Sequence, residues 1–323
     1  MTLPEKIISG KKVGVYCLGN DGYIEWFQMF ARCLRHFNPT LPLTVIPYNA
    51  EVTQLKKLAT QFHFNLLPEA EVARFDALED QVMKMGRYAG MFRKWASFFG
   101  DYDYFIFFDA DIAVTMPLDE FFAALIKSDC DFVYFDPDPT HVYRLECMAE
   151  LKAKSHAPDS PSFNAGAFAA RKGAVTEEQL WRTAEASAPD REKFNLMHVD
   201  QPFLNYVFDM LPRRKTALST FLPAYAPYRA SDAGFHYDAV QDQMLDAAGR
   251  QMPYIHWAGC QYPTMARPEI FLKYRTLGMN SAERFRYLVD FYWRRGRRTL
   301  KNSLQKFKPT ASLLALREKI KGP

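Results

Sequence analysis

The sequence has few cysteines and no long apolar run. Its five cysteines are scattered through 323 residues without a Cys-x-x-Cys pair, which argues against a disulfide framework and against a zinc knuckle. We therefore expect a protein of the reducing cytoplasm. No apolar stretch approaches the roughly 18 residues that a membrane span requires, and residues 1–13 lack the apolar centre of a secretory signal.

The composition is that of a folded globular protein. Hydrophobic residues make up 48% and charged residues 24%, which excludes wholesale disorder and fibrous architectures. The chain shows neither an internal repeat nor a low-complexity segment. A length of 323 residues suits one large α/β domain or two ordinary domains.

The first fifty residues indicate a strand, a helix and a second strand. Val13–Leu18 is a short apolar run that ends in the turn cluster Gly19–Gly22. Residues Tyr23–Phe37 carry large apolar side chains at helical spacing, and Leu43–Ile46 follows as the next strand. Strands that alternate with helices predict an α/β fold with a mostly parallel sheet covered on both faces.

The same patterns predict further elements along the chain. We expect helices over Arg87–Phe99, Thr176–Ala186 and Asp200–Phe208, and strands over Tyr104–Phe108, Phe132–Phe135, Phe163–Ala170 and Pro253–Trp257. Residues 137–162 are rich in proline and charge and indicate an irregular segment long enough for a lid or an acceptor loop.

Two carboxylates follow the most strand-like run of the chain. Asp109 and Asp111 flank Ala110 directly after Tyr104–Phe108. Ligands of open α/β sheets bind outside the carboxyl ends of the strands, and two close carboxylates repel each other unless a cation lies beside them. We therefore expect a divalent cation here, and His256, at the end of another strand, is a candidate third ligand that favours Mn²⁺ over Mg²⁺.

Five segments in this order carry a resemblance to a known family. They are Asn20-Asp21-Gly22-Tyr23, Asp109-Ala110-Asp111, Phe163-Asn164-Ala165-Gly166, Asp200-Gln201-Pro202-Phe203-Leu204-Asn205 and His256-Trp257-Ala258-Gly259. Together they resemble retaining glycosyltransferases of the GT-A fold, and most closely family 8, the glycogenin and lipopolysaccharide galactosyltransferase type. The resemblance spans roughly residues 13–260.

The resemblance implies a metal-dependent transfer of a sugar from a nucleoside diphosphate donor, with a UDP-sugar expected, to an unidentified carbohydrate, lipid-linked or protein acceptor. It implies that Mn²⁺ or Mg²⁺ is held by Asp109, Asp111 and His256. It implies donor contacts from Leu18, Asn20, Asp21, Tyr23, Asp109, Ala110, Asn164, Ala165 and Gly259.

The resemblance also implies catalytic roles. Asp200 and Gln201 would lie beside the anomeric carbon, and Arg93 and Lys94 would contact phosphate or sugar. These roles suit a reaction that develops positive charge on the sugar and negative charge on the leaving diphosphate. The chain departs from the family pattern at Pro202, where an acid is common. It departs again at Cys260-Gln261-Tyr262-Pro263, where the family often has Lys-Pro-Trp and its lysine reaches the phosphate. That contact is then either lost or supplied from elsewhere, with Arg267 and the basic tail as candidates.

The last 43 residues differ in charge from the rest. Residues 281–323 hold 12 basic and 3 acidic residues, whereas residues 1–280 hold 29 basic and 34 acidic ones. We expect a GT-A nucleotide-sugar transferase domain over 1–280 and a basic amphipathic helical extension over 281–323. The extension suits either an anionic membrane surface on the cytoplasmic side or a helix packed on the domain, with equal weight. Nucleic acid is not expected, because no recognisable binding module accompanies the patch.

Two other functions stay open at this point. A sugar-phosphate nucleotidyltransferase also uses paired acids and a metal, but it usually has a glycine-rich, lysine-containing loop that Gly19–Gly22 does not provide. The other alternative is a non-catalytic protein that binds nucleotide sugars or anchors a partner through its basic tail.

Overall fold

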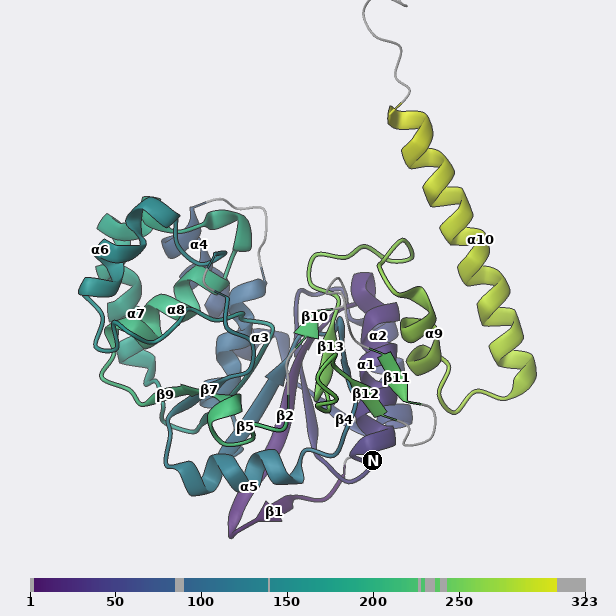
Figure 1. The fold of residues 1–323 in the computed structure, drawn as a ribbon, viewed down its shortest axis with the longest axis horizontal. Helices are drawn as coiled ribbons and strands as arrows, with labels where there is room; N and C mark the ends of the chain where they lie inside the picture. Colours follow the sequence, from purple (N-terminus) through teal and green to yellow (C-terminus); the bar gives the residue numbers. More distant parts are fainter. Residues whose placement is uncertain are drawn as a thin grey trace, which may run out of the picture.

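The computed structural model describes residues 3–84, 90–138, 140–225, 228–229, 236–238 and 243–306. An eight-stranded sheet forms its centre (Figure 1), with the strand order β4-β3-β2-β5-β8-β7-β9 and β1 paired to β2. The strands are β1 Lys6–Ile8, β2 Lys11–Gly19, β3 Leu43–Pro47, β4 Phe64–Leu66, β5 Tyr104–Phe108, β7 Phe132–Tyr134, β8 Ala167–Arg171 and β9 Lys215–Ala217.

On one side of β5, strands β2, β3 and β4 run parallel to it, and only the short β1 is antiparallel to its neighbour β2. Strand β2 pairs in parallel with β3 and β5, and β3 pairs in parallel with β4. Beyond β5, strand β8 is antiparallel to both of its neighbours, and β7 and β9 are again parallel. The predicted α/β fold with a mostly parallel sheet is confirmed.

Helices cover both faces of the sheet (Figure 1), with α1, α2 and α9 on one side and α4, α6, α7 and α8 on the other. The helices are α1 Ile24–Phe37, α2 Thr53–Phe62, α3 Glu69–Val72, α4 Arg74–Met83, α5 Asp119–Ser128, α6 Met148–Ala153, α7 Glu177–Ala186, α8 Gln201–Met210, α9 Pro268–Arg275 and α10 Ser281–Lys306. Among the residues described, none of these helices has the length and apolar character of a membrane span.

Alternate residues of the central strands serve two separate cores. In β5, Ile106 and Phe108 join the core under α1, whereas Phe105 and Phe107 join the core under α8. Successive side chains of a strand point to opposite faces, so a strand buried on both sides becomes a continuous apolar run. This is why Tyr104–Phe108 is the clearest strand signal in the sequence.

A small second sheet brings distant segments together. It contains β6 (Ile112–Val114), β13 (Tyr254–His256) and β10 (Tyr228–Arg229). Strands β6 and β13 are antiparallel, with Ile112 opposite His256, and the Trp257 amide donates to the Asp111 carbonyl at 3.0 Å. The expected strand near residue 255 is confirmed, and this pairing carries His256 to the acidic pair. The hairpin of β11 (His236–Asp238) and β12 (Gln243–Leu245) forms a third sheet.

Three expected elements differ in the structure. Residues Met91–Phe99 form a 3-10 helix, in which every third residue faces the same side, rather than an α-helix; residues 87–89 lie outside the described residues. The strand expected from Phe163 begins only at Ala167, because Phe163 exchanges hydrogen bonds with the Asn205 side chain instead. Residues 137–162 are not wholly irregular, since they contain α6 and a 3-10 turn at Leu145–Cys147.

Helix α10 lies at the periphery beyond α9 (Figure 1). Its Phe291 is fully buried and packs on Phe271 and Tyr262, with ring centroids 6.0 Å and 5.7 Å apart. Its Tyr287 hydroxyl donates to Glu25 of α1 at 2.9 Å. The packed-helix interpretation thus describes one face of α10. The tail residues 307–323 lie outside the described residues, and a domain boundary at residue 280 stays a prediction.

Candidate active site at the carboxyl edge of the sheet

The acidic pair lies at the carboxyl edge of the parallel strands. Strand β5 ends at Phe108, and the Asp109 amide then donates to the Gly166 carbonyl at 2.8 Å. The parallel neighbour β2 ends at Gly19, so Asn20 emerges at the same edge. Because β6 starts one residue after Asp111, the two acids occupy a tight corner between the two sheets.

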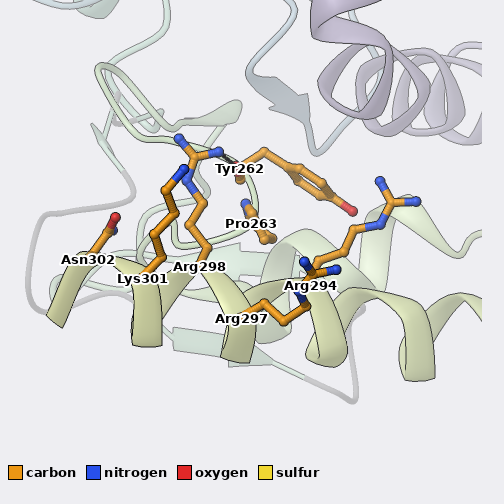
Figure 2. A pocket seen from close by; sticks show the side chains of 7 residues that line it. All are labelled: Tyr262, Pro263, Arg294, Arg297, Arg298, Lys301 and Asn302. Carbon is orange, nitrogen blue, oxygen red and sulfur yellow. Dashed lines mark hydrogen bonds between the residues drawn. The ribbon is translucent and has the colours of Figure 1, made fainter. Parts of the chain in front are cut away.

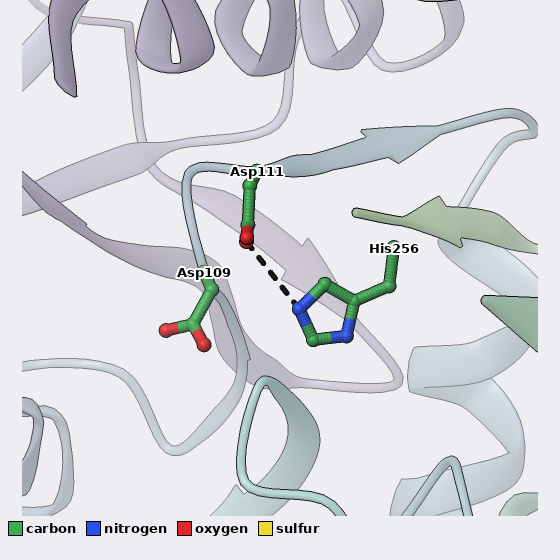
Figure 3. A group of neighbouring side chains, drawn as sticks. All are labelled: Asp109, Asp111 and His256. Carbon is green, nitrogen blue, oxygen red and sulfur yellow. Dashed lines mark ion pairs between the residues drawn. The ribbon is translucent and has the colours of Figure 1, made fainter. Parts of the chain in front are cut away.

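Asp109, Asp111 and His256 form one cluster (Figure 3). Each offers a ligand atom, and these atoms all lie within 4.8 Å of one another. His256 Nε2 is 3.3 Å from Asp111 Oδ1. Within the described part of the chain, Nδ1 of the buried His256 has no hydrogen-bond partner. Two carboxylates and an imidazole with spare capacity fit a divalent cation, and the mixed oxygen and nitrogen set suits Mn²⁺ better than Mg²⁺.

The charges in this corner are poorly balanced. The pKa of Asp109 is raised to about 6, chiefly by burial; Lys94 opposes this shift and the neighbouring Asp111 contributes to it. Burial would lower the pKa of His256, but the charges of Asp111 and Asp109 outweigh it, so the net pKa is raised. Negative charge is therefore in excess at a half-buried site, which is the condition that favours a bound cation.

Lys94 is the buried cation of the site. Its side chain is 3% exposed, and its Nζ lies 2.6 Å from Asp200 Oδ2 and 3.5 Å from Asp109 Oδ1. The same Nζ donates to the Ala165 carbonyl at 3.1 Å. Burial lowers the pKa of Lys94, but the two carboxylates outweigh it and the net pKa is raised, so the amine stays charged.

Arg93 faces a different cluster. Its guanidinium pairs with Asp76 at 2.6 Å and with Glu69 at 2.8 Å, and it donates to the Pro47 carbonyl at 3.1 Å. The sequence placed both basic residues at the donor. The structure brings Lys94 to the acidic corner and directs Arg93 toward α3 and α4.

A cavity of about 460 Å³ opens beside the cluster, and we call it the donor cavity. Of the residues expected at the site, it is lined by Leu18, Asn20, Tyr23, Lys94, Asp109, Ala110, Asp111, Asp200 and Gly259. Asp21 points elsewhere, because its carboxylate accepts from the amides of Gln54 and Leu55 at 2.9 Å and so caps α2. Asp200 precedes α8 at the N-cap position, but its side chain does not cap the helix.

Gln201, Asn164 and Ala165, which were also expected at the site, are not among the residues that line the donor cavity. Gln201 Oε1 accepts from the Ala165 amide at 3.2 Å, and its Nε2 donates to Asp138 Oδ2 at 3.1 Å. Asn164 Oδ1 accepts from the Gly166 amide at 2.8 Å. A side chain at Gly166 would approach His256 to 2.5 Å, so only glycine allows the ring to reach the acids.

Two residues that were not expected from the sequence, Tyr48 and Met91, also line the donor cavity. Tyr48 follows Pro47, the last residue of β3, and β3 is parallel to β2. The rule that ligands gather at the carboxyl ends of parallel strands would have identified it. Its ring lies 5.9 Å from that of Tyr23, so two aromatic faces stand at one end of the cavity.

The architecture is similar to those of solved glycosyltransferase structures. The structure of the galactosyltransferase LgtC in complex with donor and acceptor sugar analogs is similar to this chain with a TM-score of 0.54 and 13% identity, covering 84% of this chain and 99% of that one. An apo structure of the bifunctional glycosyltransferase WbbM has a TM-score of 0.52 and 15% identity, covering 88% of this chain and 53% of that one. The fold is thus that of GT-A glycosyltransferases.

The family follows from the sequence match. Residues 9–220, more than half of the chain, match Glycosyl transferase family 8. The chain belongs to this family and is a glycosyltransferase. The matched range includes Asp109, Asp111, Asp200 and Gln201, whereas His256 lies beyond it. No curated protein matches the chain.

Proposed function

We propose that this glycosyltransferase transfers a hexose from a UDP-sugar to a carbohydrate-containing acceptor, with retention of configuration and with dependence on Mn²⁺ or Mg²⁺. One observation carries the proposal. The ligand atoms of Asp109, Asp111 and His256 lie within 4.8 Å of one another, and the two aspartates line a cavity of about 460 Å³. A diphosphate is the donor group that needs such a site, because a divalent ion neutralises its charge as it leaves.

Lys94 is the residue that acts on the leaving group in this proposal. It is the cation that the described lining of the donor cavity contains, and both Asp109 and Asp200 keep it charged. A fixed ammonium in a buried site stabilises developing phosphate charge without reorganisation. No lysine comes directly after His256-Trp257-Ala258-Gly259. In this proposal Lys94 makes the phosphate contact that such a lysine would otherwise make.

Asp200 and Gln201 are proposed to act on the donor sugar. Asp200 lines the cavity, and its carboxylate stabilises the positive charge that develops on the sugar ring. Gln201 is held from both ends by Ala165 and Asp138, so its amide has a fixed orientation. At the other end of the cavity, Tyr23 and Tyr48 offer ring faces for the uracil base, and Leu18 and Asn20 line the intervening wall.

We also propose that α10 binds an anionic membrane surface. This helix begins the basic extension that was expected over residues 281–323. Phe285, Val289 and Trp293 follow one another at intervals of four residues and are 69%, 55% and 65% exposed. A helix that packs one face on the domain and exposes an apolar stripe beside many cations suits the interface of an anionic membrane. The five free cysteines support the cytoplasmic side.

A donor screen tests the proposed reaction. Full-length protein is heated with single nucleotide sugars in the presence and absence of Mn²⁺, and the donor that raises the melting temperature is then tested for hydrolysis. We expect Mn²⁺-dependent stabilisation by UDP-sugars and slow release of UDP. Stabilisation by a nucleoside triphosphate, with pyrophosphate released only on addition of a sugar phosphate, would instead identify a nucleotidyltransferase.

A vesicle assay tests the membrane surface. Trp293→Ser and Phe285→Ser together should weaken binding to phosphatidylglycerol vesicles, whereas the packed face of α10 is unchanged. Binding that equals the wild type would contradict this part of the proposal.

A further inference from the structure

A second cavity lies between α10 and the loop that follows β13. It measures about 670 Å³. In Figure 2 the side chains of α10 reach from one face of the helix toward the loop. We call it the cationic cavity, and its walls include Tyr262, Pro263, Arg294, Arg297, Arg298 and Lys301.

The four cations share one helix face, and one of them, Arg294, pairs with a carboxylate. Residues 297 and 298 each lie three or four positions from both 294 and 301, so these cations are neighbours on the helix surface and repel one another. Within residues 243–306 and the rest of the described chain, only Arg294 has a carboxylate partner, which is Asp290 at 2.7 Å. Charge of one sign on the wall of a cavity attracts an anion.

The cavity wall is held in place by neutral acceptors. Arg298 donates to the Tyr262 carbonyl at 3.1 Å and to the Gln261 side chain at 2.9 Å. Arg295 donates to the carbonyls of Pro263 at 2.7 Å and Met265 at 3.2 Å. These contacts fix the loop on the helix through neutral groups that bring no negative charge to the cavity. Guanidinium forks match phosphate oxygens in geometry as well as in charge.

The cationic cavity adjoins the donor cavity through consecutive residues. Gly259, Cys260 and Gln261 line the donor cavity, and Tyr262 and Pro263 line the cationic one. Arg298 binds Gln261 directly, so one arginine bridges the two walls. The two cavities therefore meet along residues 259–263, so a molecule in the cationic cavity lies next to the donor cavity.

We propose that the cationic cavity binds a phosphate group of the acceptor, so that the acceptor is a phosphorylated glycan. The inference rests on the proposed function, because it places the acceptor next to the donor cavity. The same phosphate chemistry is present in a lipid headgroup. The exposed apolar stripe, however, follows a different face of α10, since Phe285, Val289 and Trp293 do not line the cavity.

Titration with glucose 6-phosphate and with inorganic phosphate tests the site in the full chain. The variant Arg297→Gln/Lys301→Gln removes two cavity cations, and Arg284→Gln/Arg286→Gln removes two exposed cations of the same helix outside the cavity. Calorimetry in EDTA keeps metal away from the donor cavity. We expect glucose 6-phosphate to bind about tenfold or more weakly to the first variant, and within about twofold of the wild type to the second. Equal affinity in both variants, or no binding by the wild type, would overturn the proposal.

Vesicles distinguish the two sources of phosphate. Against mixed phosphatidylcholine and phosphatidylglycerol vesicles, an acceptor site predicts equal binding by the two charge variants. A selective loss of vesicle binding in Arg297→Gln/Lys301→Gln, with glucose 6-phosphate affinity at the wild-type level, would assign the cavity to lipid and overturn the proposal.

A third variant separates this inference from the proposed function. Asp111→Ala should keep its glucose 6-phosphate affinity in EDTA while it loses Mn²⁺-dependent UDP binding. If Asp111→Ala still binds UDP in a Mn²⁺-dependent way, the proposed metal site is wrong. The affinity for glucose 6-phosphate in EDTA tests the cationic cavity separately.

Discussion

Replacing Lys94 with methionine should destabilise the protein strongly, because it leaves a buried carboxylate without its partner. Methionine keeps most of the side-chain volume, so the change removes charge more than packing. Lys94 is 3% exposed and Asp200 is 8% exposed, and their charged atoms are 2.6 Å apart. Removing one member of a buried pair costs about 3–5 kcal/mol, whereas neutralising both is often close to neutral.

The assay is urea denaturation of the metal-free protein, followed by circular dichroism. We expect Lys94→Met to lose about 3 kcal/mol or more in the free energy of unfolding, and Lys94→Met/Asp200→Asn to recover most of that loss. Lys127→Met, at an exposed position of α5, serves as the control and should change stability by less than about 0.5 kcal/mol. A loss below about 1 kcal/mol in Lys94→Met, or a double variant equal to the sum of the single ones, would refute the reasoning.

Three further predictions concern Gln201, the buried Glu79 and the C-terminal helix. Gln201→Ala should lower turnover far more than donor affinity, and equal losses in steady-state kinetics would make Gln201 a binding residue only. Burial raises the pKa of Glu79 to about 7, so the folded state holds this proton more tightly than the unfolded state, and stability is lost as the pH rises through that value. Relative to Glu79→Gln, the wild type should lose on the order of 2 kcal/mol of unfolding free energy between about pH 5 and pH 8, and a flat difference would contradict the shift. Phe291→Ala should cost about 3–5 kcal/mol because its ring is fully buried, whereas Trp293→Ser should leave the melting temperature unchanged; comparable losses would show that both rings are packed.

The sequence predicted the site best where a strand is buried on both faces. Tyr104–Phe108 is an uninterrupted apolar run, so its end, and with it Asp109 and Asp111, could be located without a structure. His256 could be proposed because another apolar strand ends there. Its meeting with the acids depends on the pairing of β6 with β13, which joins segments far apart in sequence and leaves no local pattern.

Neighbouring residues with the same chemistry could not be told apart. Arg93 and Lys94 are consecutive, and only the 3-10 geometry of Met91–Phe99 decides which one reaches Asp109. Asp21 belongs to a motif expected at the donor, yet its carboxylate caps α2 because the helix begins beside it in space. Side-chain direction in turns follows from tertiary contacts, which residue spacing does not encode.

The C-terminal helix shows a different limit of sequence reasoning. Packing on the domain and binding to a membrane were weighed as alternatives for residues 281–323. In α10 one face packs on the domain and another is exposed, because Phe291 is buried while Trp293, two residues later, is 65% exposed. One helix can therefore serve as a packed element and still present a free surface.

Calorimetric titration of UDP into the full-length protein tests the central claim most directly. If Asp109, Asp111 and His256 hold the cation that binds the diphosphate, UDP should bind the wild type tightly only with Mn²⁺ present. Asp111→Ala should lose this dependence while keeping its circular dichroism spectrum. UDP affinity that is the same with and without Mn²⁺, or unchanged in Asp111→Ala, would contradict the account.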